Sequence, residues 1–346
     1  MKIDDDWMKA LGRSARFYPY QCDLPGQTFC FIALDEDGYR QQSFLDRRAL
    51  TPGAWHGWLD RRSVNRELAR IAPELPLHFI FHTGHAGSTL VSRLLDWLSP
   101  ILPLREPLPL RQLCDALDTG SADATLQPMW STTWRLWRRG FQDTRAVIVK
   151  ATSYCARHAQ AIIQTHPRSR AIYLGLGAHQ HLATLLSKPG TLSDLGGFRD
   201  ERLARLQSML GFAPPPLMTA GELAAMSWLC EDLTRRRALQ AVGDRILDVD
   251  FDALLDEPRQ HLQRILRHLN LPFDPVRLRD VANCPLFGQY SKATDFHYTP
   301  KLRAELLQQT RLEHAREIRR GRRWLERLGH DSTVVASLLG EQSRHY

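Results

Sequence analysis

From residue 77 onward, short apolar runs alternate with longer stretches of helical spacing, and this alternation most constrains the fold. Four runs have the length and composition of buried strands: Leu77–Phe81, Ala146–Val149, Ala171–Leu176 and Arg245–Phe251. Strands that alternate with helices form a parallel sheet covered on both faces. We therefore expect an α/β protein, a P-loop-like three-layer sandwich with a central parallel sheet.

The first 75 residues follow a different pattern. Phe29–Leu34 is a strand candidate, and Tyr39–Leu45 is expected to return beside it as a second strand. We expect residues 1–75 to form a small α+β N-terminal appendage and residues 76–346 to form the P-loop-like domain.

Composition excludes several classes of protein. Of the 346 residues, 43% are hydrophobic and 24% are charged, which excludes a disordered or fibrous chain. Apolar runs are all shorter than the roughly 18 residues of a membrane span, and the Asp-rich N-terminus is unlike a secretory signal. Six cysteines without a Cys-x-x-Cys motif predict reduced thiols, a cytoplasmic protein and no structural zinc.

The net charge of +8 is concentrated near the C-terminus. Residues 301–330 hold nine Lys and Arg against four Asp and Glu. Two interpretations are open: a solvated helix face, or a rim that attracts a small polyanion. Nucleic acid is not an expected partner, because zinc-finger spacing and basic-aromatic interleaving are both lacking.

The loop after the first strand has the composition of an anion cradle. Gly84, Ala86 and Gly87 precede a helix expected to begin near Leu90, and Ser88 and Thr89 add hydroxyl donors. In the Walker A register, His82 replaces the first Gly and Ser88 replaces the Lys. An ordinary ATP or GTP hydrolase or kinase is therefore disfavoured, and a turn without a ligand is the other interpretation.

The stretch His85-Ala86-Gly87-Ser88-Thr89 resembles the 5′-phosphosulfate loop of sulfotransferases, with His85 where that family usually has Arg or Lys. Within the family the chain looks most like divergent bacterial proteins with a Gly-Ser-Thr-Leu loop. The resemblance implies that His85 stabilises charge on the donor, although an imidazole is only partly charged near neutral pH.

The order of later residues extends the resemblance. Glu106, nineteen residues after Gly87, stands where tyrosylprotein sulfotransferases place a catalytic base. The alternative is a surface glutamate paired with Arg105 or Arg111. Lys150, at the end of a strand, corresponds to the family lysine that stabilises the bridging oxygen of the leaving phosphate.

Two further segments imply contacts with the donor. Ser291 and Lys292 resemble a C-terminal Ser-Lys element that binds the phosphosulfate, a solvated loop lysine being the alternative. Where the family's 3′-phosphate motif has Arg, this chain has Leu176, while Thr184 can replace the motif's Ser. Either other cations, such as Lys188 or Lys292, hold a 3′-phosphate, or the donor lacks one.

The resemblance implies a transferase that moves a sulfuryl group from 3′-phosphoadenosine 5′-phosphosulfate (PAPS) to a hydroxyl or amine of a small-molecule or peptide acceptor, without a metal. Two alternatives are open. One is a nucleotide-dependent phosphotransferase, in which Asp248, Asp250 or Asp252 binds Mg²⁺ with help from Thr89. The other is a non-catalytic binding protein with a degraded donor site.

Overall fold

In the computed structural model, a five-stranded parallel sheet forms the centre of the protein, in the order β5-β6-β4-β7-β8. The structure describes residues 5–50, 56–69, 74–120, 124–187, 189–291 and 297–343. The strands of the central sheet are β4 (Leu77–His82), β5 (Ile101–Arg105), β6 (Ala146–Lys150), β7 (Ala171–Gly175) and β8 (Ile246–Asp250). All four neighbouring pairs are parallel. The predicted fold class is confirmed.

The helices fall into two groups along the chain. Those up to β8 are α1 (Asp5–Arg13), α2 (Glu36–Gln41), α3 (Arg61–Leu68), α4 (Ser88–Leu98), α5 (Leu108–Asp118), α6 (Leu126–Trp137), α7 (Ala159–Gln164), α8 (Ala178–Leu186), α9 (Pro189–Gly197), α10 (Arg199–Leu210) and α11 (Ala220–Val242). Those after β8 are α12 (Phe251–Asp256), α13 (Pro258–His268), α14 (Pro275–Arg279), α15 (Pro300–Glu313), α16 (Ala315–Asp331) and α17 (Thr333–Ser343).

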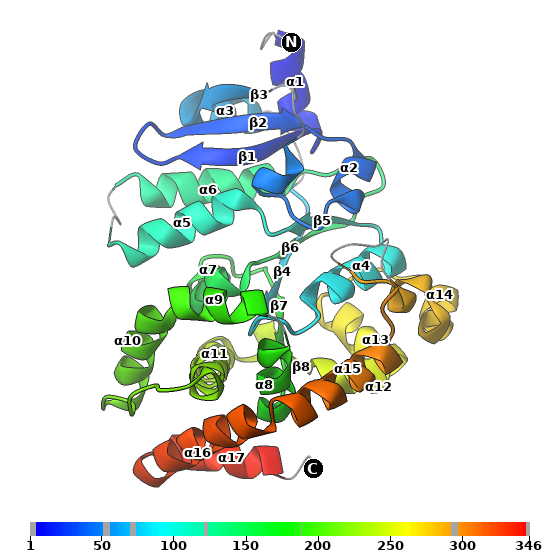
Figure 1. The fold of residues 1–346 in the computed structure, drawn as a ribbon. Coiled ribbons are helices and arrows are strands. Elements are labelled where there is room, and N and C mark those ends of the chain that lie inside the picture. Colours follow the sequence, from blue (N-terminus) through cyan, green and yellow to red (C-terminus); the bar gives the residue numbers. More distant parts are fainter. Residues whose placement is uncertain are drawn as a thin grey trace.

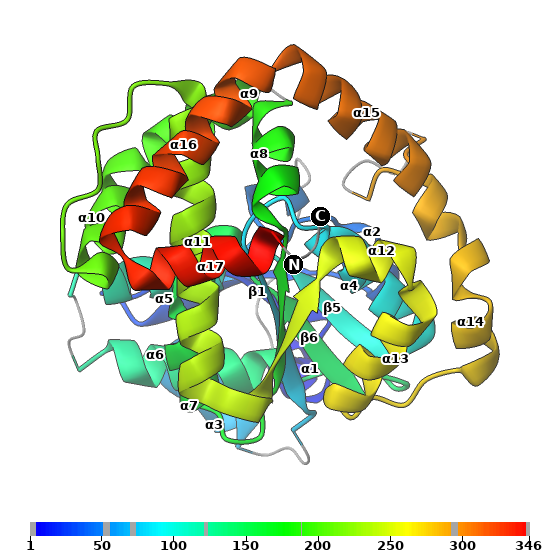
Figure 2. The ribbon, with the colours of Figure 1, turned by 90° about the horizontal axis from the view of Figure 1, so that it is seen from below.

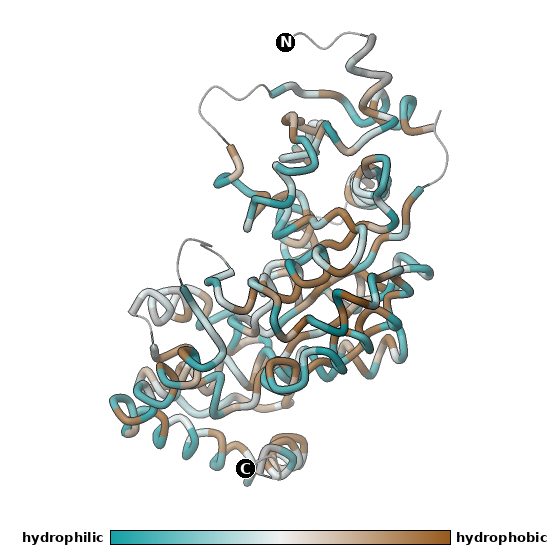
Figure 3. Tube along the Cα trace, turned by 90° about the vertical axis from the view of Figure 1, so that its right-hand side faces the viewer, coloured by the Kyte–Doolittle hydropathy of each residue, from teal (hydrophilic) through white to brown (hydrophobic). Residues whose placement is uncertain are grey.

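Alternate residues of each central strand enter two different cores. On β4, Phe79 and Phe81 pack with α5, α6 and the N-terminal residues, whereas Ile80 packs with α4, α12 and α13. This alternation follows from the two-residue repeat of a strand. Figure 1 shows the resulting layers, and Figure 3 shows apolar segments concentrated through the middle of the molecule.

The sequence did not predict β5, and its proline explains why. Pro103 lies inside the strand and removes one ladder donor. Because β5 is at the edge of the sheet, only its β6 side needs to pair, and proline is tolerated there. The strand matters for the site, since it places residue 106 beside the end of β6.

The N-terminal residues form an antiparallel sheet of β1 (Phe17–Asp23), β2 (Thr28–Ala33) and β3 (His56–Asp60). The predicted strand at 39–45 is wrong: Glu36–Gln41 is helix α2, because Asp35 caps it by accepting a hydrogen bond from the Gly38 amide. One continuous buried cluster joins these residues to α5, α6 and the central sheet.

The C-terminal helices pack on α11 and border the carboxyl ends of the strands. Gly221 of α11 and Gly321 of α16 meet at a close crossing, where an added Cβ on Gly221 would lie 1.9 Å from the Glu317 carbonyl oxygen. Figure 2 shows α15 and α16 running along the outside of the molecule. None of the helices in the described ranges has the length and apolar character that crossing a bilayer requires.

Candidate functional site

A cavity of about 450 Å³ opens at the carboxyl ends of β4 and β6. Nine of the residues singled out from the sequence line it: His85, Ala86, Gly87, Ser88, Thr89, Glu106, Lys150, Thr184 and Ser291. Gly84 is in the same loop but is not a lining residue, and Lys292, like Lys188, lies outside the described residues. Loops at this end of a parallel sheet commonly bind ligands.

The loop between β4 and α4 has an unusual backbone. Gly84, His85 and Gly87 have φ values of +86°, +53° and +64°. Gly87 is also fixed by packing, because an added Cβ would lie 2.0 Å from the Phe251 ring. Backbone in this left-handed region turns successive amide groups inward, which is the geometry of an anion-binding nest.

Helix α4 begins at the cavity without a side-chain cap. Gly87 is its N-cap residue and has no side chain to accept hydrogen bonds from the first turn. The first-turn amides and the positive end of the helix dipole therefore face the cavity. Thr89 is 3% exposed, and its Oγ1 has no hydrogen-bond partner in the described part of the chain. A buried hydroxyl of this kind needs an acceptor, which an oxyanion oxygen would supply.

His82, which the sequence analysis did not single out as a ligand, holds the loop from below. Its Nε2 lies 3.1 Å from the Ala151 carbonyl oxygen, and its Nδ1 accepts a hydrogen bond from the Gly84 amide. This pattern requires a neutral ring with the proton on Nε2. His82 thus ties the end of β4 to the end of β6.

Lys150 and Glu106 form an ion pair at the ends of adjacent strands. Lys150 Nζ donates to Glu106 Oε1, and the Glu106 amide donates to the Lys150 carbonyl oxygen at 2.7 Å. The lysine side chain is 1% exposed and the glutamate side chain 14%. Glu106 has a φ of +54°, an uncommon conformation for this residue. The pair is therefore a buried base and a buried cation on one cavity wall.

Arg105 does not pair with Glu106, which overturns the alternative of a surface ion pair between them. The Arg105 side chain is fully buried and donates to the carbonyl oxygens of residues 39, 40 and 42 and to Asp96. Burial lowers the pKa of Arg105 to about 10. This guanidinium fixes the N-terminal segment against β5 and α4.

That N-terminal segment reaches the ion pair. The Arg48 guanidinium lies 3.3 Å from the centre of the Phe44 ring and 3.8 Å from Glu106 Oε2, while Lys150 Nζ lies 5.7 Å from the same ring. Sequence reasoning missed both residues, since nothing in residues 1–75 marks them as neighbours of the loop.

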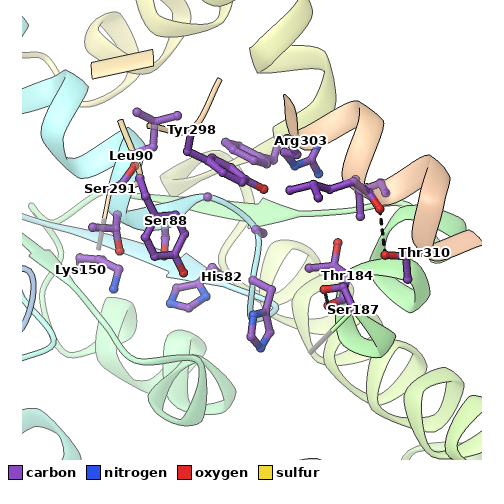
Figure 4. Close-up of a pocket in the computed structure, with 18 of the residues that line it drawn as sticks. His82, Ser88, Leu90, Lys150, Thr184, Ser187, Ser291, Tyr298, Arg303 and Thr310 are labelled. Carbon is purple, nitrogen blue, oxygen red and sulfur yellow. Dashed lines mark hydrogen bonds between the residues drawn. The ribbon is translucent and has the colours of Figure 1, made fainter. Parts of the chain in front are cut away.

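Ser291 is held by its backbone. Arg93 of α4 donates from Nε to the Ser291 carbonyl oxygen at 3.0 Å and from Nη2 to Ser43 Oγ at 3.0 Å. Figure 4 shows Ser291 and Lys150 on one side of the cavity, away from Thr184 and Ser187.

The far wall of the cavity carries hydroxyl groups and one arginine. Thr184 of α8 and Thr310 of α15 line it, together with Arg303, which pairs with Asp252 at 2.7 Å. Arg303 Nη2 is buried without a hydrogen-bond partner among the described residues. Of the nine cations of residues 301–330, which are described throughout, Arg303 alone lines the cavity. The clustered charge of that segment lies mostly elsewhere.

The leucine in place of the family arginine is a core residue. Leu176 is 4% exposed, and its carbonyl oxygen accepts a hydrogen bond from Trp228 Nε1. It therefore contributes no side-chain contact to the cavity.

The three aspartates of the phosphotransferase alternative do not converge. Asp248 pairs with Arg235, Asp250 caps α12 by accepting from the Ala253 amide, and Asp252 pairs with Arg303. None of the three lines the cavity that contains Thr89. Within the described ranges, no group of three or more His, Cys, Asp or Glu is arranged to hold a metal ion.

Comparison with known proteins gives similarities in structure only. No protein-family model and no curated protein matches the chain. A sulfotransferase domain from the curacin biosynthetic pathway is 14% identical, covering 70% of this chain and 99% of that one, with a TM-score of 0.40. Sulfotransferase STF9 from Mycobacterium avium is 14% identical, covering 72% and 80%, with a TM-score of 0.38. Mouse sulfotransferase SULT7A1, complexed with PAP, is 10% identical, covering 74% and 90%, with a TM-score of 0.35.

The similar structures are sulfotransferases. Their resemblance to this chain is too distant to transfer a residue role or an activity, so the functional argument below rests on this chain's own geometry.

Proposed function

We propose that this protein is a sulfuryltransferase that uses PAPS as its donor and a hydroxyl or amine group of a small molecule or peptide as its acceptor. The observation that carries the proposal is one cavity that combines an uncapped helix N-terminus with the buried Lys150–Glu106 pair. An anion cradle beside a buried base and a buried cation is the set of groups that group transfer from a phosphosulfate needs.

The residues present fit the donor's 5′ end. Gly87 leaves the space that a side chain would fill, and Thr89 presents an unpartnered buried hydroxyl. The first-turn amides of α4 and the hydroxyl of Ser88 would hold the phosphate oxygens. His85, Ser291 and Lys292 would add further donors at the same end. When bound, the donor supplies an activated sulfur–oxygen bond to a phosphate leaving group.

Glu106 would remove the acceptor's proton as the acceptor oxygen or nitrogen bonds to sulfur. The bond between sulfur and the bridging phosphate oxygen breaks in the same step, and Lys150 would neutralise the charge that develops on that oxygen. Because Lys150 contacts Glu106 in this structure, its ammonium would have to turn from the carboxylate toward the donor, which frees Glu106 Oε1 for the proton.

The far wall would hold the rest of the nucleotide. Arg303, Thr184 and Thr310 would contact a 3′-phosphate there, taking the place of the arginine replaced by Leu176. Arg303 already pairs with Asp252, so its contribution would come from the unpartnered Nη2. A cytoplasmic location belongs to the same proposal and is supported by six free, buried thiols.

Ligand-dependent thermal stability tests the proposal. Adenosine 3′,5′-bisphosphate at 100 times its Kd should add about 2.7 kcal/mol of stability. Stabilisation by the bisphosphate and not by ATP with Mg²⁺ is the expected result. A response only to ATP with Mg²⁺ would favour the phosphotransferase, and a response to neither would favour a binding protein with another ligand.

A further inference from the structure

A second concave site lies at the opposite end of the central sheet. Its volume is about 360 Å³, within the range of small-ligand pockets. Leu75 lines it just before β4, and Thr144 and Arg145 line it just before β6. The candidate functional site is at the other ends of the same strands. The six residues of β4 separate the two by about 16 Å, at roughly 3.3 Å per step.

Arginine dominates the lining of this second pocket. Its lining includes Arg13, Arg135, Arg138, Arg139 and Arg145, with Glu74 as the acidic member. Asp143, in the turn that contributes Thr144, is not a lining residue.

Arg139 has a structural task and is not available to a ligand. It is 7% exposed and donates to the carbonyl oxygens of Leu11, Ser14, Phe17 and Leu136. These bonds fix the end of α1 and the start of β1 against the end of α6. They also hold the pocket wall in place, so the pocket has a rigid base.

The other four arginines share one carboxylate. Glu74 accepts from Arg138 Nη1 at 2.6 Å and lies 3.4 Å from Arg135 Nε. Arg138 Nε is buried and has no hydrogen-bond partner in the described residues. Arg13 and Arg145 are exposed and make no ion pair within those residues. Four guanidinium groups around one carboxylate leave a strong positive potential in a concave wall, where water screens charge less well than on a flat surface.

We propose that this arginine pocket is a binding site for a small, multiply charged oxyanion such as a di- or polyphosphate group. The planar guanidinium matches the spacing of two oxygens on one phosphorus, and several such groups at different angles suit a ligand with more than one phosphate. The site is independent of the proposed function, because it shares no residue with the candidate functional site.

Isothermal titration of the full chain with inorganic pyrophosphate at low ionic strength tests the site. The Arg138→Gln/Arg145→Gln variant should lose one binding equivalent. The matched control Arg62→Gln/Arg199→Gln removes the same charge from exposed positions outside both pockets and should keep it. If both variants bind alike, the proposal is wrong.

A gain of affinity separates binding from folding. Glu74→Gln removes the carboxylate that occupies Arg135 and Arg138, so it should tighten pyrophosphate binding about tenfold, the order of one charge-assisted hydrogen bond. A misfolded variant would bind more weakly, not more tightly. An unchanged or weaker affinity in Glu74→Gln, with an unaltered circular dichroism spectrum, would overturn the proposal.

Discussion

Removing one partner of the Lys150–Glu106 pair should cost more stability than removing both. Lys150→Met deletes the cation while keeping an unbranched chain of similar length, and it leaves a largely buried carboxylate without its partner. Breaking a buried pair from one side costs about 3–5 kcal/mol, and the 14% exposure of Glu106 puts this pair at the lower end, about 3 kcal/mol. Glu106→Gln alone leaves the buried ammonium without its counter-charge and should cost a similar amount.

The double variant removes both charges from the cavity wall. We expect Lys150→Met/Glu106→Gln to be less destabilised than the sum of the single variants, with a coupling free energy of about 2 kcal/mol or more. Urea denaturation followed by tryptophan fluorescence measures all four proteins. Lys301→Met, at an exposed position, is the matched lysine control and should add independently with Glu106→Gln. Additive losses in Lys150→Met/Glu106→Gln would refute the buried-pair reasoning.

Three more predictions follow from the site. Gly87→Ala should abolish binding of adenosine 3′,5′-bisphosphate and destabilise the protein, since the left-handed φ alone costs about 1–2 kcal/mol and the new Cβ meets Phe251; Gly196→Ala, with open space around it, is the control. Burial, with His85 nearby, lowers the pKa of His181 to about 3, so the unfolded chain takes up a proton first as pH falls below about 6.5 and stability declines toward pH 3. His181→Gln should flatten that decline in urea midpoints measured from pH 7 to 4.5, and an unchanged slope would contradict this assignment. Glu106→Gln should lower turnover by about 100-fold or more once an acceptor is found, and turnover equal to that of the unmodified protein would exclude Glu106 as the base.

The strand–helix alternation was enough to predict the central sheet, because buried parallel strands are short apolar runs that stand out from their flanks. It failed where backbone chemistry hides a strand. Pro103 in β5 and Pro19 in β1 both interrupt the expected pattern, and an edge position or a register shift accommodates each. The segment at 39–45 failed for another reason, since the Asp35 cap favours a helical turn over a returning strand.

The sequence located most of the cavity lining for a topological reason. Residues that follow parallel strands meet at one edge of a sheet, so Ser88, Glu106 and Lys150 come together although they are distant along the chain. Phe44, Arg48 and Arg303 could not be found in this way. Their positions depend on how two other parts of the chain pack against the sheet, which no local pattern encodes.

The buried guanidinium of Arg105 has a consequence for any shortened form of this protein. Its partners at residues 39, 40 and 42 belong to the first 75 residues, and so does much of the apolar surface that covers α5 and α6. A chain cut at residue 75 would leave a cation at a dry edge without acceptors and would expose an aromatic face to water. We therefore expect one cooperative melting transition for the whole chain and aggregation of the truncated form. The early residues would act as an internal scaffold for the catalytic edge, beyond the reach of any deletion that spares the fold.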